Sequence, residues 1–211
     1  MKKITGVGAI ACAMLFASNA SFAEGTMAAD HAGEIMVRAR AVQLNWQNSS
    51  NPVAGVAAQN KTIPEVDLSY FFTSNIAAEL ILTYPQKVNI NLSGTPLGSV
   101  KALPPILTLQ YHFAPDSQSF RPYVGAGINY TNFSSVSLAA GATPLNVKKS
   151  STGLALQAGF DVPITENLTF NLDLKKAYIK TDVSAATSGA YVTTLNVDPY
   201  LVGVGLGWKF F

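Results

Sequence analysis

The chain has 211 residues, of which 48% are hydrophobic and only 12% are charged. Its formal net charge is +2, and the two lysines at positions 2 and 3 account for that excess. The rest of the chain has no basic field that would attract nucleic acid, and so low a charge content suits an outer surface facing hydrocarbon better than a soluble protein.

The first predicted element in chain order is a removable export signal over residues 1–23. Two lysines precede an apolar stretch over residues 4–16, and Ser21 and Ala23 supply the small residues of a cleavage site. Residues 24–211 would then form the mature domain. Cys12, the only cysteine, lies inside the signal, so the mature chain forms no disulfide. A lipoprotein acylated at Cys12 is the alternative, but the residues before it match an acylation motif poorly.

Beyond the signal, eight segments of about ten residues alternate between apolar and polar side chains, a period of two that is typical of β-strands. This is the length of a tilted strand that crosses a bilayer, and an even number of strands is what single-chain bacterial barrels have. The sequence therefore predicts an all-β fold, an eight-stranded antiparallel transmembrane β-barrel. The predicted strands are residues 34–46, 62–72, 75–84, 103–113, 121–133, 151–163, 168–180 and 194–210.

The connections between these segments alternate in length, which indicates the topology. Residues 73–75, 114–120 and 165–167 are short or turn-like and are expected to face the periplasm, as are both chain ends. Longer polar connections, over residues 47–61, 89–100, 138–150 and 182–193, are expected to be extracellular loops. Six apolar residues within or beside these loops suggest an apolar mouth: Val53, Val56, Leu92, Leu97, Leu138 and Leu145.

A secreted two-sheet sandwich is the alternative all-β fold, because it also contains short alternating strands. A sandwich does not need aromatic residues at the ends of its apolar segments. A membrane barrel uses them as girdles at both interfaces. Aromatic residues at such ends therefore favour a barrel in the bacterial outer membrane; they are Tyr84, Tyr111, Phe113, Tyr130, Tyr200 and Trp208.

The middle of the chain carries a specific family resemblance. The motifs are Leu103-Pro104-Pro105-Ile106-Leu107, Leu109-Gln110-Tyr111-His112-Phe113 and the run from Phe120-Arg121-Pro122-Tyr123 to Asn129-Tyr130-Thr131. In these motifs the sequence resembles the OmpW/AlkL family of outer-membrane channels, and further matches extend the similarity over nearly all of the mature chain. The resemblance implies an eight-stranded barrel, acting as a monomer, that is associated with passage of small hydrophobic molecules across the outer membrane.

Barrel geometry constrains the route of such a solute. Eight strands leave an interior largely filled by side chains, so an apolar solute cannot readily pass down the axis. Pro104 and Pro105 interrupt the fourth predicted strand, because proline donates no ladder hydrogen bond. We expect a lateral opening there, as the resemblance also implies, that releases the solute sideways into the membrane. A bulge without a transport role is the alternative.

Charged residues on the inward face of the predicted strands indicate a polar interior. Mixed charges in a narrow interior require paired networks, and such a network would fill the lower barrel; ion selectivity is the alternative. The resemblance places the aliphatic constriction residue of the family at Ile81 and its tryptophan partner at Lys175, so the apolar gate of the family is not reproduced here. The polar network is expected to include Arg38, Arg40, Glu79 and Asp173, with Glu65, Asp67 and Asp161 beside them.

Other functions compete with transport. An enzymatic barrel would need histidine beside serine or carboxylate near the upper mouth. His31 precedes the first strand and His112 lies near the periplasmic end of the fourth, so neither catalysis nor metal binding by two distant histidines is expected. A structural or adhesive barrel acting through its surface loops is the remaining alternative. The expected partners are small hydrophobic solutes, outer-membrane lipid and lipopolysaccharide, without nucleic acid or a cofactor.

Overall fold

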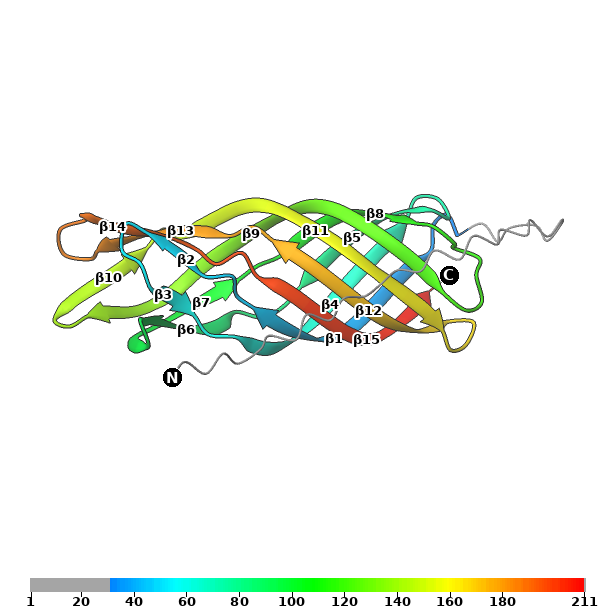
Figure 1. Cartoon of the computed structure of the whole chain (residues 1–211). Coiled ribbons are helices and arrows are strands. Elements are labelled where there is room, and N and C mark those ends of the chain that lie inside the picture. Colours follow the sequence, from blue (N-terminus) through cyan, green and yellow to red (C-terminus); the bar gives the residue numbers. More distant parts are fainter. Residues whose placement is uncertain (1–30, 211) are drawn as a thin grey trace, which may run out of the picture.

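The computed structural model describes residues 31–210, which form an elongated barrel of β-strands (Figure 1). The predicted export signal, its cleavage site and Cys12 lie outside the described residues, so they stay predictions. Within residues 31–210, no helix is long and apolar enough to cross a membrane.

Eight long strands make the barrel wall, each antiparallel to its neighbours. The last strand pairs with the first over eleven registered residues, which closes the sheet and leaves no free edge. The predicted eight-stranded antiparallel barrel is therefore confirmed. The wall strands are β1 (Ile35–Asn45), β4 (Lys61–Phe71), β5 (Ile76–Leu82), β8 (Ile106–His112), β9 (Arg121–Ala140), β11 (Ser150–Pro163), β12 (Leu168–Ala177) and β15 (Tyr200–Phe210).

The longer connections differ from the predicted loops, because many of their residues extend the wall as strands at the extracellular end, on the left of Figure 1. A second set of alternating apolar residues is the cause: Val88 and Ile90 turn inward from one strand, and Val100 and Ala102 from the next. The additional strands are β2 (Ser49–Asn51), β3 (Val56–Ala58), β6 (Gln86–Leu92), β7 (Thr95–Leu103), β10 (Thr143–Val147), β13 (Lys180–Ala185) and β14 (Tyr191–Asn196).

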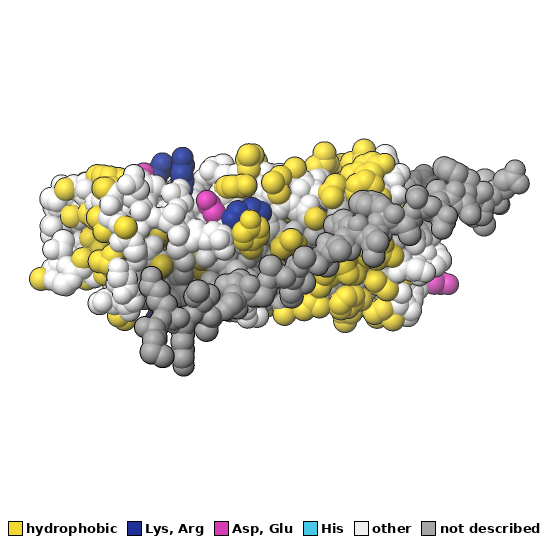
Figure 2. Space-filling model, viewed as in Figure 1, with side chains coloured by type: hydrophobic (Ala, Val, Ile, Leu, Met, Phe, Trp, Pro, Cys, Tyr) yellow, Lys and Arg dark blue, Asp and Glu magenta, His cyan; other side chains and the backbone are white. Residues whose placement is uncertain are grey.

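The outer wall is apolar over the periplasmic half, where Figure 2 shows hydrophobic side chains gathered on the right. Aliphatic side chains such as Leu80, Leu107 and Leu156 are exposed there. Aromatic side chains border them in two belts, as on a barrel that spans a membrane. The lower belt contains Tyr70, Phe72, Tyr111, Phe113, Trp208 and Phe210, and the upper tyrosine belt contains Tyr84, Tyr130, Tyr178 and Tyr200.

Candidate functional site

The inward side chains of the barrel strands change from polar to apolar at about one level. In β1, Arg40 is followed towards the extracellular end by Val42, and in β12, Lys175 is followed by Ala177; all four are buried. The interior thus has a polar lower half and an apolar upper half. We call the polar half the plug; its charged members are Arg38, Arg40, Glu65, Asp67, Glu79, Asp161, Asp173 and Lys175.

Arg40 is the centre of the plug. Its guanidinium group donates to Asp67 and Glu79. Its Nε lies 3.2 Å from Glu65 Oε1, and its Nη1 lies 3.3 Å from Asp173 Oδ2. These carboxylates come from β4, β5 and β12, so one side chain of β1 ties three other strands together. Buried charges are tolerated when they are paired and hydrogen-bonded in this way.

Arg38 forms the layer nearer the periplasm. Its Nη2 donates to Asp161 Oδ2 at 2.8 Å, and its Nη1 donates to Asp67 Oδ1 at 3.3 Å. Asp67 therefore joins the two arginines into one connected set. The structure brings together all four residues that the sequence assigned to a polar network: Arg38, Arg40, Glu79 and Asp173.

Both histidines lie at the periplasmic end, where they line one small pocket with Phe71. The expectation that they are distant from each other is therefore wrong, because residues before β1 fold back over the barrel end: the backbone N–H of Gly33 donates to Phe71 O at 2.8 Å. His31 Nδ1 lies 2.6 Å from Glu34 Oε1. Within residues 31–210, no group of three or more histidines, cysteines and carboxylates is arranged to hold a metal.

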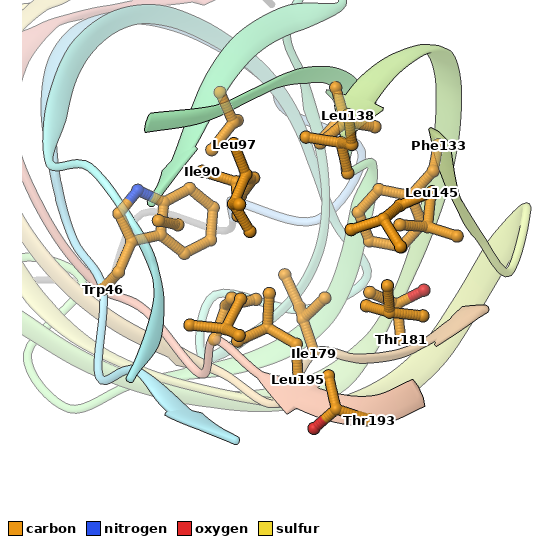
Figure 3. Close-up of a pocket in the computed structure, with 18 of the residues that line it drawn as sticks. Trp46, Ile90, Leu97, Phe133, Leu138, Leu145, Ile179, Thr181, Thr193 and Leu195 are labelled. Carbon is orange, nitrogen blue, oxygen red and sulfur yellow. The ribbon is translucent and has the colours of Figure 1, made fainter. Parts of the chain in front are cut away.

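Above the plug lies an apolar space, which we call the upper cavity. Its empty volume is about 970 Å³, including the part that is open to solvent. None of the described residues that line it is charged, and its polar lining residues are three threonines. Figure 3 looks into this space, with Trp46 on one side and Phe133 and Leu145 facing it from the other. A lining of this kind binds apolar molecules.

The upper cavity confirms one prediction and adds residues that the sequence did not reveal. All six apolar residues assigned to the mouth line it: Val53, Val56, Leu92, Leu97, Leu138 and Leu145. Ile179, Val183 and Leu195 also line it, from β13, β14 and the residues beside them. Their alternation with polar residues was visible in the sequence, but it did not distinguish a cavity wall from an ordinary strand.

The barrel wall is interrupted next to the upper cavity. Towards the periplasm, β5 and β8 pair as far as Ile81 opposite Ile106. Towards the outside, β6 and β7 pair from Gln86 opposite Ala102. Residues 83–85 and 103–105 face each other between these two ladders without a registered pair. We call this interruption the wall break.

Prolines explain the wall break. Pro85, Pro104 and Pro105 have no N–H group to donate. The carbonyl of Pro105 accepts from the N–H of Tyr130 in β9 at 3.0 Å. Since successive residues of an extended strand direct their backbone groups to opposite neighbours, Pro104 is turned towards residues 83–85. Pro104 also lines the upper cavity, so the cavity and the wall break meet at this residue.

Gln86 is a polar residue at the wall break that the sequence analysis missed. Its side chain is buried, and its Nε2 donates to Tyr84 O at 3.1 Å. Its Oε1 has no hydrogen-bond partner among the described residues. With Pro104 and Ile106, Gln86 lines a small apolar pocket that continues from the upper cavity towards the plug.

The two residues assigned to a constriction lie on opposite sides of the boundary between cavity and plug. Ile81 is buried in the apolar core of the upper half. Lys175 belongs to the plug, where its Nζ lies 2.8 Å from Glu65 Oε1 and 2.6 Å from Asp173 Oδ1. A charged side chain is accepted at this position because two carboxylates hold it.

Comparison with known proteins places this architecture among outer-membrane proteins. The sequence matches the OmpW family over residues 30–210. It is 40% identical over 209 residues to an uncharacterized outer-membrane protein of Sinorhizobium fredii, y4mB, a match that covers 96% of this chain and 90% of that protein. It is 31% identical over 207 residues to outer membrane protein W of Vibrio cholerae, covering 90% and 95% of the two chains.

A solved structure shows the same fold. The crystal structure of the outer membrane protein OprG from Pseudomonas aeruginosa superposes with a TM-score of 0.73 at 27% sequence identity. The match covers 85% of this chain and 96% of that one. The closed barrel is thus shared with a protein that has been observed experimentally.

Proposed function

Because the chain belongs to the OmpW family of outer-membrane barrels, we propose that it takes up small hydrophobic molecules, which enter the upper cavity from outside and leave sideways through the wall break. One observation carries this proposal: the apolar upper cavity reaches Pro104 at the wall break, whereas charged side chains fill the barrel below it. An apolar molecule in the cavity therefore has a short apolar route to the membrane and a polar obstacle along the axis.

The upper cavity would give an apolar solute a favourable intermediate environment. Burying about 200 Å² of apolar surface lowers the free energy by roughly 5 kcal/mol relative to water. Loss of translational and rotational freedom offsets much of that gain, so the solute would be concentrated without being held tightly. Release into hydrocarbon costs little, because the membrane interior is as apolar as the cavity lining.

The plug supports lateral rather than axial release. Its eight charged side chains are all nearly inaccessible to solvent, with Arg38 and Glu79 fully buried. An apolar solute that moved down the axis would have to separate these ion pairs, and breaking a buried pair costs about 3–5 kcal/mol. In this proposal Lys175 closes the bottom of the solute path, and Ile81 lines its last apolar section.

A purely structural or adhesive barrel explains the molecule less well. Such a protein acts through its outer loops and does not need an apolar interior space. Here the extracellular connections place Val53, Leu97 and Leu138 in the wall of the upper cavity. The cavity lies within a single chain, so the proposed transport also works for a monomer.

Two proline substitutions test lateral release. Pro104→Val adds an N–H group that points towards residues 83–85, so it should close part of the wall break; Pro105→Val adds one that points towards β9, where the wall is already closed. A restored ladder hydrogen bond contributes about 0.5–1.5 kcal/mol. In cells that depend on a hydrophobic carbon source, P104V should slow uptake several-fold and raise the unfolding temperature slightly, whereas P105V should leave uptake unchanged.

The matched pair makes the result interpretable. Both variants replace proline with the same apolar residue at adjacent positions, so a general effect of removing a proline would appear in both. Uptake by correctly assembled P104V at the wild-type rate would exclude release through the wall break. Correct assembly is checked by heat-dependent migration in gels and by the amount of protein in the outer membrane.

A further inference from the structure

Charges on the outer surface are strongly segregated. Of the lysines in residues 31–210, seven lie at or above the upper tyrosine belt, and the only carboxylates of the described chain beside them are Asp182 and Asp198. Seven positive charges against two negative ones leave an excess of five on the part of the barrel that faces the outside. The seven are Lys61, Lys87, Lys101, Lys148, Lys149, Lys176 and Lys180.

Two of these lysines are placed in an unfavourable arrangement. Lys87 in β6 and Lys101 in β7 are direct partners in the antiparallel register, and both are exposed on the outer face. Such partners have Cβ atoms only about 5 Å apart, and like charges in this position destabilise a sheet. A third ammonium group is near, because Lys61 Nζ donates to the backbone carbonyl of Lys87 at 3.5 Å.

No carboxylate of the described chain compensates this pair. The ion pairs within residues 31–210 include only two lysines, Lys175 in the plug and Lys209 at the periplasmic end. The two outer aspartates have partners on other strands. Asp182 in β13 accepts from the hydroxyl group of Thr194 at 2.6 Å, and Asp198, which precedes β15, accepts from the N–H of Ile179 at 2.8 Å. The pair of ammonium groups on β6 and β7 therefore lacks the counter-charge that it needs.

The position of Lys87 relative to the upper tyrosine belt gives the level of the pair in the membrane. Lys87 follows Tyr84 of the upper tyrosine belt by three residues, which is about 10 Å along a strand and about 7 Å along the membrane normal at a usual tilt. The headgroup region extends roughly 5–8 Å beyond the hydrocarbon on each side of a bilayer. The two ammonium groups thus lie at the level of the lipid headgroups.

We propose that Lys87 and Lys101, with the hydroxyl group of Ser134, form a binding site for a phosphate monoester, and that its ligand is the phosphorylated sugar headgroup of lipopolysaccharide. Ser134 is the register partner of Lys101 on β9 and is exposed on the same face. A phosphate monoester carries nearly two negative charges and several strong acceptor oxygens, which match two ammonium groups and one hydroxyl. The site lies directly outside the wall break, so it positions a lipid headgroup above the proposed exit but does not depend on transport.

Binding of a defined lipid tests the site. The folded mature protein in detergent micelles is titrated with bisphosphorylated lipid A and with the same lipid after removal of both phosphates. Each lysine near an anionic surface contributes roughly a fivefold gain in affinity, so the phosphorylated lipid should bind roughly 30-fold more tightly. K87Q/K101Q should lose most of this difference.

A matched variant separates a site from general attraction. K176Q/K180Q removes the same charge from β12 and β13, away from Ser134, and should retain most of the difference between the two lipids. Equal losses in both variants would overturn the proposal, as would equal binding of the two lipids by the wild type. Competition by inorganic phosphate at concentrations comparable to the lipid would show a site for the free anion and would overturn its assignment to a lipid.

Hydrogen exchange gives an independent readout in the same samples. Without a phosphorylated lipid, repulsion between the two lysines should speed exchange of the backbone amides of β6 and β7, and K87Q/K101Q should slow it. Lipid A should protect these amides in the wild type and leave them unchanged in K87Q/K101Q. Protection of the same amides in both proteins would contradict a role for the two lysines.

Discussion

Replacement of Arg40 by methionine tests whether the plug stabilises the barrel. Methionine retains much of the volume of the side chain and removes its charge. In the native protein the plug contains five carboxylates and three cationic groups, so R40M leaves five carboxylates facing two cations. Glu65, Asp67, Glu79 and Asp173 each lose a partner in the same substitution.

The expected loss of stability is taken as the cost of removing one charged partner from a buried ion pair. Removal of one partner from a buried ion pair costs about 3–5 kcal/mol. With a urea dependence of about 2 kcal/mol per molar for a protein of this kind, the unfolding midpoint should fall by about 2 M. Tryptophan fluorescence of the barrel refolded into lipid vesicles reports this midpoint, because Trp208 lies near the periplasmic end of the wall and Trp46 lines the upper cavity.

A control and a second substitution sharpen the result. Arg121 is half-buried near the periplasmic end, and within the described chain it donates only to the backbone carbonyl of Ser117, at 2.7 Å, and forms no ion pair. R121M should therefore lower the free energy of unfolding by less than about 1 kcal/mol. Adding Glu79→Gln to R40M removes one orphaned carboxylate and should restore part of the lost stability. An R40M midpoint within 0.5 M of the R121M midpoint would refute the view that ion pairs of the plug hold the lower barrel together.

Two further outcomes are expected. Ala102 is buried and lines both the upper cavity and the pocket beneath it. Ala102→Trp should therefore slow uptake of hydrophobic compounds at least several-fold without changing uptake of small sugars, as measured by growth on each substrate. An equal loss of uptake for hydrophobic compounds and for sugars would indicate a general pore. Residues 24–211 contain no cysteine, so a single introduced cysteine can be labelled there selectively. Ser188→Cys in the β13–β14 turn should react with a membrane-impermeant maleimide on intact cells, whereas Glu166→Cys should not; the reverse labelling would invert the topology.

The wall strands could be predicted because a membrane barrel imposes period-two alternation on its sequence. In β4, Glu65 and Asp67 alternate with Val66 and Leu68, and the structure buries the first pair and exposes the second. Such a pattern assigns every residue to one face, since a shift by one position would place carboxylates in lipid. The interior charges of the plug followed from the same parity.

The extracellular strands could not be predicted in the same way. Residues of β6 such as Asn89 and Asn91 are frequent in loops, and they outweighed the inward alternation of Val88 and Ile90. Whether these strands lie in lipid or above it depends on the level of the upper tyrosine belt, which is a property of the assembled barrel. Pairing between β3 and β6, or between β10 and β13, joins segments far apart in the chain and leaves no local signal.

Contacts within the site were also beyond a single sequence. The parity of Lys175 placed it inside the barrel, but its position between Glu65 and Asp173 depends on the register of β12 against its neighbours. Gln86 illustrates the opposite case. Its burial follows from alternation, yet its importance arises only because the wall break lies beside it and leaves its Oε1 without a partner in the described structure.

The plug and the wall break depend on each other physically. An unpaired stretch in a barrel wall would spread if the strands on both sides were free to separate, because each lost ladder bond exposes further polar groups to lipid. Here β5 and β8 remain paired from Ile76 opposite Tyr111 to Ile81 opposite Ile106, directly below the wall break. Glu79 of β5, held by Arg40 and by Gln110 of β8, fixes that ladder from the inside. R40M should therefore speed hydrogen exchange in the β5–β8 ladder more than in the β9–β11 ladder, whose strands carry no hydrogen-bond or ion-pair partner of Arg40 in the described structure. Equal acceleration of both ladders would disconnect the plug from the wall break.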